Sequence, residues 1–374
     1  PMQSIERSLR ATSQCSFFVS KYKQRKELIY MVKNKNLNDS KKRKNDEFYT
    51  LLPDIEAELQ HYKKRFRGKI IYCNCDNPEF SNFWKYFKIH FEEFGIKKLI
   101  ATYYDSGKPT YKYVLSSGND KPTKTPLTGD GDFRSPECIE ILKEADVIVT
   151  NPPFSLFKEY IAQLIKYDKR FIIIGSLNAV GYRDVFPLIK SRQIWISSNN
   201  QHQHFRIPDD YDIGVTCVDS DGHKYATLGN IAWFTNIPTE IEFSDLALTA
   251  LYSPDKYPHY DNYDAINVNK LSEIPCDYDG VMGVPITFIG KYNPGQFKIL
   301  GITTGSDAFE AVPTKKYINP VRMTGTSKGG SSTNTSAVLL LSEPPEDGAY
   351  YTADNVEGFL KVLYKRILIQ KNKP

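Results

Sequence analysis

Apolar side chains between residues 54 and 175 follow two alternating spacings. One face of a helix is predicted by the three- and four-residue steps that separate Ile55, Leu59, Tyr62 and Phe66. The stretch 171–175 is instead a short continuous apolar run, which is typical of a strand buried on both faces. Together the two patterns predict helices over 54–66, 82–94, 136–144 and 156–166, and strands over 69–73, 98–103, 147–150 and 171–175.

This alternation of strands and helices predicts an α/β fold, in which a doubly wound parallel sheet is covered by helices on both faces. Ligands of such sheets bind beyond the carboxyl ends of the strands. The connecting loops are therefore the candidate ligand-binding segments, namely 74–78, 104–105, 129–133 and 151–154.

From about Trp195 onward the pattern changes to short apolar runs broken by Pro, Gly, Asn and Asp. We expect a second, mixed α+β domain there, with a segment at 325–333 that is flexible by composition. The Leu-, Val- and Ile-rich stretch 359–369 is predicted to be a helix or a strand. Because 374 residues exceed what one compact core usually holds, two structural units are expected.

Basic residues are concentrated at the beginning of the chain. Residues 1–46 hold twelve Lys and Arg against four Asp and Glu, which gives +8 there, whereas the whole chain carries 49 − 44 = +5. A basic arm that neutralises phosphates and a solvated terminus explain this excess equally well. The predicted organisation is an arm over 1–45, an α/β domain over 46–194 and a second region over 195–374.

The cysteines and the apolar runs indicate the class of protein. Six cysteines occur, and none has the Cys-x-x-Cys spacing of zinc or redox sites, so reduced thiols in a cytosol fit best. The longest apolar runs are strand-length, far short of the roughly twenty residues that a membrane-spanning helix needs. We therefore expect a cytoplasmic protein with neither a metal site nor a membrane segment.

The tetrapeptide Asn151-Pro152-Pro153-Phe154 directly follows a predicted strand and suits the binding of an exocyclic amine. The amine of adenine is a poor nucleophile because its lone pair is delocalised into the ring, so an enzyme must hold it pyramidal and aimed. The Asn151 side-chain oxygen and the Pro152 carbonyl would accept its two N–H groups from a backbone stiffened by proline. Phe154 would stack on the flipped base. The alternative is an ordinary Pro-rich loop between a strand and a helix.

Two other segments are candidates for holding a cofactor. Asp132 and Phe133 lie one helix before the strand 147–150, where an acidic side chain and the next backbone N–H suit an adenine ring. Taken alone, Asp-Gly clusters of this kind are commonly turns. The segment 46–50 carries an aromatic pair and a hydroxyl that suit covering a cofactor, although an N-cap and an anchor are the simpler interpretation.

Several other chemistries are disfavoured. The pair Gly129 and Gly131 lacks the third glycine of a dinucleotide-binding loop, which argues against an NAD enzyme. Neither a Walker A lysine motif nor a His-Glu-x-x-His motif occurs, so phosphate transfer and zinc hydrolysis have no visible machinery. His202 and His204 alternate in a polar segment that suits contact with DNA better than metal binding.

Taken together, these segments resemble the EcoRI-type family of adenine-specific DNA methyltransferases. The resemblance covers most of residues 31–300. It rests on runs much longer than the tetrapeptide alone, namely 45–50, 72–76, 129–135, 149–157, 260–268 and 280–285. Two departures from the usual methyltransferase pattern are present. The glycine-rich first loop is replaced by 73–78, and Asp105 is the nearest counterpart of the acid that binds the cofactor ribose.

The resemblance implies a Rossmann-like methyltransferase sheet over 46–194 and DNA recognition by 195–374. It implies transfer of a methyl group from S-adenosylmethionine to N6 of a flipped adenine in double-stranded DNA, at a GAATTC-like target. Its implied catalytic residues are Asn151, Pro152, Pro153 and Phe154. Its implied cofactor-binding residues are Phe48, Tyr49, Thr50, Asn74, Cys75, Asp76, Asn77, Asp105, Asp132 and Phe133.

The resemblance also implies a restriction-modification or orphan modification system of bacterial, plasmid or phage origin, with a cognate restriction endonuclease encoded nearby as a possible partner. Two alternatives stay open. One is a methyltransferase of the same fold that acts on RNA or on a protein glutamine, and the other is a DNA-binding protein that has lost catalysis. The large C-terminal region favours duplex DNA, and the intact 151–154 element favours activity.

Overall fold

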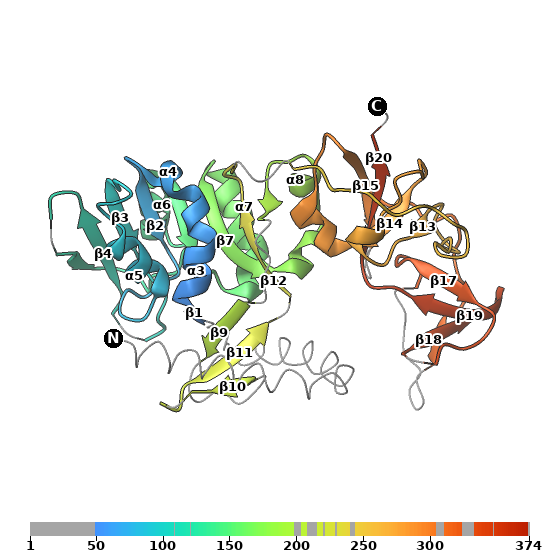
Figure 1. The fold of residues 1–374 in the computed structure, drawn as a ribbon. Helices are drawn as coiled ribbons and strands as arrows, with labels where there is room; N and C mark the ends of the chain where they lie inside the picture. The colour runs from blue at the N-terminus through green and yellow to red at the C-terminus, as the bar shows by residue number, and fades with distance from the viewer. Residues whose placement is uncertain are drawn as a thin grey trace. The chain divides into compact units, whose positions relative to one another are not determined.

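The computed structural model describes residues 49–107, 109–119, 121–197, 203–207, 215–219, 221–228, 230–239, 244–303, 310–323, 333–346 and 348–372 (Figure 1). The predicted basic arm, His202 and nearly all of 325–333 lie outside these ranges. The chain forms two compact units, Pro1–Gly175 with Gln201–Ile231, and Ser176–Asn200 with Ala232–Pro374. The assignment of functions to 1–45, 46–194 and 195–374 stays a prediction.

Four parallel strands form the centre of the largest sheet in the first unit (Figure 1). Each coincides with a strand that the hydrophobic pattern predicts. Every side chain of the two central strands is buried, as expected for a sheet covered on both faces. In spatial order the strands are β3 (Lys98–Ala101), β2 (Ile70–Cys73), β6 (Val147–Thr150) and β7 (Arg170–Ser176).

The predicted helices are present with shifted ends. The first is divided into α3 (Leu52–Leu59), a 3-10 turn η2 (Gln60–Tyr62) and α4 (Lys63–Phe66), and its predicted apolar face is buried. The others are α5 (Asn82–Ile89), α6 (Pro136–Glu144) and α7 (Phe157–Lys166). Because β-α-β crossovers are right-handed, α5 lies on the opposite face of the sheet from α6 and α7. The first unit is therefore α/β, as predicted.

A hairpin at the edge of this sheet is not predicted by the hydrophobic pattern. Strand β4 (Tyr111–Ser116) pairs antiparallel with β3, and β5 (Thr123–Pro126) pairs antiparallel with β4. All four residues of β5 are exposed, so β5 lacks the alternation of apolar and polar side chains that marks a half-buried strand. The sheet is therefore mixed rather than purely parallel.

The direction of winding reverses between β2 and β6. From β2 the chain moves outward to β3, then returns past β2 to β6 and onward to β7. The connections that leave the carboxyl ends of β2 and β6 therefore diverge, and ligands of open α/β sheets bind at such a point. The segments 74–78 and 151–154 both begin there.

A smaller antiparallel sheet in the first unit includes the first described residues of the chain. Strand β1 (Tyr49–Thr50) pairs with β9 (Gln203–Ile207), and β9 pairs with β11 (Lys224–Leu228). Strand β10 (Cys217–Val218) completes the sheet beside β11. This pairing places Thr50 opposite the buried Phe205, far away in the sequence.

The second unit contains two further four-stranded sheets (Figure 1). The unit also holds α8 (Phe186–Lys190) and β8 (Trp195–Ile196), which pairs antiparallel with β12 (Ile231–Thr235). One of the two sheets has the order β13 (Ile266–Asn267), β14 (Met282–Pro285), β20 (Arg366–Lys371) and β15 (Phe297–Thr303). The other has the order β16 (Val321–Met323), β18 (Tyr350–Ala353), β19 (Val356–Val362) and β17 (Val338–Leu341).

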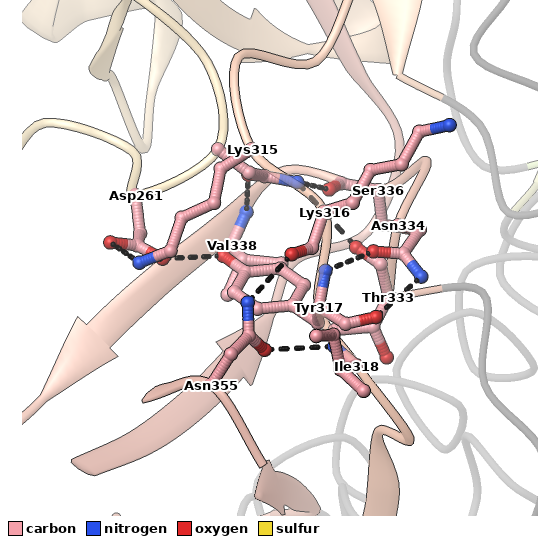
Figure 2. A network of polar contacts seen from close by, with 11 residues as sticks. Asp261, Lys315, Lys316, Tyr317, Ile318, Thr333, Asn334, Ser336, Val338 and Asn355 are labelled. Carbon is pink, nitrogen blue, oxygen red and sulfur yellow. Dashed lines mark hydrogen bonds and ion pairs between the residues drawn. The ribbon is translucent and has the colours of Figure 1, made fainter. Parts of the chain in front are cut away.

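A polar network in the second unit joins segments that are distant in sequence (Figure 2). Asp261 accepts hydrogen bonds from Lys315 Nζ at 3.1 Å and from the Tyr317 hydroxyl at 2.7 Å. The amides of Asn334 and Asn355 each bond the backbone of the segment 316–318. This segment is therefore fixed from several sides at once.

The second region differs from its predicted composition. Among the described residues after Trp195, helical structure is limited to two 3-10 segments, η5 (Leu271–Glu273) and η6 (Ile286–Lys291), so its mixed α+β character is not confirmed. The stretch 359–369 contains the end of β19, a short connection and most of β20. Within the described part of the chain, no helix is long and apolar enough to cross a membrane.

Candidate active site

The carboxylate of Asp76 joins the two segments that leave the carboxyl ends of the central strands β2 and β6. Asp76 follows β2, and its Oδ1 accepts a hydrogen bond from the Ser81 hydroxyl at 2.8 Å. Its Oδ2 accepts a hydrogen bond from the hydroxyl of Thr150, the last residue of β6. The backbone N–H of Asn151 also donates to this carboxylate. One buried side chain therefore holds the loop after β2 and the loop after β6 together.

Asp76 keeps this position at an electrostatic cost. Its exposed fraction is 8%, and burial raises the pKa of the carboxyl to about 6. The hydrogen bonds from Thr150, Ser81 and the Asn151 backbone act in the opposite direction, because they favour the charged form. At neutral pH the carboxylate is therefore ionised and stabilised by neutral donors.

The side chain of Asn151 is oriented by Thr50 of β1. Its Nδ2 atom lies 3.4 Å from the Thr50 hydroxyl oxygen, while Asn82 Nδ2 donates to the Thr50 carbonyl at 2.8 Å. Because the amide nitrogen of Asn151 faces Thr50, its Oδ1 atom points away from Thr50. This Oδ1 atom is buried. The arrangement presents Asn151 as a hydrogen-bond acceptor inside the protein.

The rest of the tetrapeptide forms a stiff entry into α7. Pro153 precedes a 3-10 turn, η3 (Phe154–Leu156), and its carbonyl accepts a hydrogen bond from the Leu156 N–H at 3.0 Å. Pro152 is buried, and Phe154 is only 7% exposed. Two prolines limit the backbone freedom of this loop, so the position of the Pro152 carbonyl is tightly restricted.

Asp132 is held by its neighbour Arg134. The guanidinium of Arg134 donates to both carboxylate oxygens of Asp132, at 2.9 Å and 2.7 Å, and also to Glu159 at 2.8 Å. These hydrogen bonds from Arg134 lower the pKa of Asp132. Gly131 before it has φ +78°, and a Cβ there would lie 1.9 Å from the Tyr103 carbonyl oxygen. Only glycine fits this approach of the loop to the end of β3.

Beside this loop, the structure contains a buried acceptor that suits an adenine amine. Gln163 of α7 donates from Nε2 to the Phe133 carbonyl at 3.0 Å, and the Phe133 ring packs edge-on against Tyr160 at 5.0 Å. Within the described residues the buried Gln163 Oε1 has no hydrogen-bond partner. A buried acceptor of this kind calls for a donor, because leaving it unsatisfied costs about 1–3 kcal/mol.

The other predicted cofactor residues contact both nearby and distant parts of the chain. The buried Asn74 accepts a hydrogen bond from the Tyr160 hydroxyl, and Asn77 Oδ1 accepts from the Glu79 N–H at 3.0 Å, which shapes the turn before α5. Cys75 is partly exposed, and burial raises the pKa of its thiol. The Asp105 N–H donates to the Asp130 carbonyl at 3.1 Å. Phe48 and the side chain of Tyr49 lie outside the described residues.

The structure brings several of the sequence-predicted site residues to one edge of the sheet. Thr50, Asp76 and Asn151 are linked by the contacts given above. Sequence reasoning missed Ser81, Thr150, Arg134, Tyr160 and Gln163. A signal existed only for Ser81, since a serine before an aromatic helix is a typical N-cap, and Ser81 does accept from the N–H groups of Phe83 and Trp84.

The described part of the chain gives no metal centre. No group of three or more His, Cys, Asp or Glu in it could hold a metal ion, and no disulfide joins its five cysteines. His202 and the side chain of His204 are not among the described groups. The acceptors and aromatic rings around 131–133 and 151–154 are therefore the candidate binding groups.

Comparison with known proteins places this chain in a family. Residues 36–372 match the family described as adenine-specific methyltransferase EcoRI. The type II methyltransferase M.EcoRI of Escherichia coli is 46% identical over 296 residues, which are 73% of this chain and 91% of that relative. The type II methyltransferase M.MpnI of Mycoplasma pneumoniae is 37% identical over 289 residues, which are 75% of this chain and 90% of that relative.

A third relative, the type II methyltransferase M.MgeORF184P of Mycoplasma genitalium, is 39% identical over 272 residues, 71% of this chain and 85% of that relative. None of the solved structures matches the chain significantly. These comparisons define the protein as an adenine-specific methyltransferase, an enzyme that requires a methyl donor. The chain belongs to the EcoRI family of adenine-specific methyltransferases, which confirms the resemblance seen in its sequence.

Proposed function

We propose that the protein transfers a methyl group from S-adenosylmethionine to N6 of an adenine that is flipped out of double-stranded DNA. The observation that carries this proposal is the position of Asn151. Its loop begins at the carboxyl end of β6, where the connections that follow β2 and β6 diverge. Its amide is oriented by Thr50. In a family of adenine-specific methyltransferases, an acceptor held in this way suits the target amine.

The tetrapeptide would act on the target base by positioning and polarisation. The Asn151 oxygen and the Pro152 carbonyl accept the two N–H groups of the amine, which draws the nitrogen lone pair out of the ring plane and aims it. Phe154 stacks on the base face and contributes about 1–3 kcal/mol to its retention. Because these groups are fixed before the substrate arrives, little reorganisation is needed at the moment of transfer.

The residues near 131–133 fit the adenine end of S-adenosylmethionine, which supplies an activated methyl group when bound. The buried Gln163 Oε1 beside the Phe133 carbonyl lacks a partner among the described residues, as expected for an acceptor that awaits an amine. Asp132 and the Phe133 N–H would contact the same ring, and Asp105 the ribose. The segments 48–50 and 74–77 would surround the methionine end.

The remaining expectations concern DNA and biological setting. Region 195–374 would read the target sequence, which by the family resemblance is GAATTC-like, and the basic arm over 1–45 would contact phosphates. A cognate restriction endonuclease is a plausible partner in a type II system. We also propose that the enzyme works in the cytoplasm and is of bacterial, plasmid or phage origin.

The test is methyl transfer from radiolabelled S-adenosylmethionine to unmethylated plasmid DNA, followed by single-molecule sequencing of the product. We expect N6-methyladenine at one recurrent short motif. Parallel reactions with total RNA and with a protein that presents glutamine side chains examine the two rival substrates. Label in either of these but not in DNA would overturn the proposal, and cofactor binding without transfer to any substrate would indicate an inactive DNA-binding protein.

A further inference from the structure

We propose that Asp76 is a positioning residue, whose buried carboxylate sets the place of Asn151 by holding the Thr150 hydroxyl and the Asn151 backbone N–H. This inference rests on the proposed role of Asn151 in binding the target amine. It differs from the predicted contact of Asp76 with the cofactor, because the carboxylate is directed inward to three protein donors.

The first argument is where the backbone ladder between β2 and β6 ends. The two strands pair at Ile71 with Val147 and at Tyr72 with Ile148, and in the described residues their ladder records no later pair. Beyond that point the segment after β2 stays attached to the neighbouring loop, since the Asp76 N–H donates to the Thr102 carbonyl at 3.1 Å. The Asp76 side chain is what then connects it to Thr150 and Asn151.

The second argument is that the donors come from separate elements. Ser81 is the N-cap of α5, and Thr150 and Asn151 lie at the end of β6. Ser81 Oγ also accepts from the first turn of α5, so the helix start, the carboxylate and the Asn151 loop form one chain of hydrogen bonds. A shift of this chain moves the Asn151 backbone, and its amide with it.

The third argument concerns charge. The titratable groups facing Asp76 are Cys73 and Cys75 on its own segment and Tyr160 on α7, and burial raises the pKa of all three, so they are neutral near pH 7. The ionised carboxylate is therefore balanced by oriented dipoles. Protonation would turn one of its acceptor oxygens into an O–H donor, which would face the donors that the ionised carboxylate accepts from.

The main test is Asp76→Asn, an isosteric change that replaces one acceptor oxygen with a donor. We expect the single-turnover rate to fall about 10- to 100-fold, the scale of a small misplacement of a positioned group. Cofactor affinity should stay within about twofold of the wild type. The melting temperature should not fall, since a pKa raised to about 6 means that the fold already favours the neutral form.

Asp146→Asn is the matched control. Asp146 Oδ2 also accepts from a backbone N–H of β2, that of Ile70 at 2.8 Å, but at the opposite edge of the sheet. This variant should keep the wild-type rate. An unchanged rate in Asp76→Asn would overturn the proposal. So would a loss of cofactor affinity as large as the loss of rate, which would make Asp76 a cofactor contact.

A second measurement does not depend on turnover. With ¹⁵N-labelled asparagine, the backbone amide signal of Asn151 should shift with a midpoint near pH 6 in the wild type, following ionisation of Asp76. The shift should be absent in Asp76→Asn and retained in Asp146→Asn. An Asn151 signal that does not move between pH 5 and 8 would overturn the proposal, even if the wild type methylates DNA. A shift in a protein without DNA methylation would overturn the proposed function alone.

Discussion

Two carboxylates, one in each compact unit, join distant segments of the chain with different partners. Asp76 accepts from the hydroxyls of Ser81 and Thr150 and from a backbone N–H, all of them neutral. Asp261 accepts instead from the charged Lys315 at 3.0 Å and 3.1 Å, and from the Tyr317 hydroxyl (Figure 2). One site is balanced by dipoles and the other by an ion pair.

The difference indicates what each site does. Asp261 forms an ion pair with Lys315, and burial together with the negative Asp261 raises the pKa of Tyr317, so this hydroxyl stays protonated near neutral pH. Within the described part of the chain Asp76 has no such cation among its hydrogen-bond donors, and its pKa of about 6 lies close to neutral pH. We therefore expect pH to change the methylation rate through the Asp76 site. The Asp261 site should contribute to the stability of the fold alone.

The largest effect should come from Asn151→Ala at the Asp76 site. Loss of a positioned polar group at a reacting atom typically costs 10²- to 10³-fold in rate, so we expect a decrease in single-turnover methylation of about that size. Cofactor affinity should be retained. The control is Asn119→Ala, which changes an exposed asparagine in the turn between β4 and β5. Full activity in Asn151→Ala would contradict the proposal that this amide binds the target amine.

The next effect is on the pH dependence of the wild type. The methylation rate should fall below about pH 6 as Asp76 is protonated, and the loss should level off at about the 10- to 100-fold expected for Asp76→Asn. Stability should move in the opposite direction. Because the folded-state pKa is raised, the contribution of this group to stability is present below about pH 4 and is lost as the pH rises through about 6. Rate and denaturation curves over pH 4.5–7.5 would sharpen the comparison, and parallel changes in both would contradict it.

A smaller effect is expected for Ser81→Ala. The change removes the N-cap of α5 and one donor to Asp76, so stability should fall by about 1 kcal/mol and the rate severalfold. Ser81→Thr keeps the hydroxyl and should restore most of both. Urea denaturation and single-turnover rates measure the two effects. A loss of stability with an unchanged rate would show that the N-cap of α5 does not influence the position of the Asn151 loop.

The smallest effect on activity should follow from Lys315→Met at the Asp261 site. The lysine side chain is 35% exposed, so after screening we expect a loss of only about 1 kcal/mol in stability. The pH dependence of the rate should keep its midpoint. Lys361→Met makes the same change at an exposed position and serves as the control. A shifted midpoint in Lys315→Met would show that the two sites are coupled.

The sequence by itself determined the parallel strands and the helices that cover them, because the spacing of apolar residues within each segment predicts them. It also determined the tetrapeptide 151–154, because this motif is contiguous in the chain. It did not indicate β5, whose four residues, Thr-Lys-Thr-Pro, are all exposed. It also missed most partners of the site, since Thr150 and Asp76 are 74 positions apart and Asn151 and Thr50 are 101 apart. Such contacts depend on the order of the strands in the sheets, which places β2 next to β6 and β1 next to β9. Only the tertiary structure could decide that the carboxylate of Asp76 is directed into the protein, because burial and hydrogen-bond donors come from elements that the local sequence does not contain.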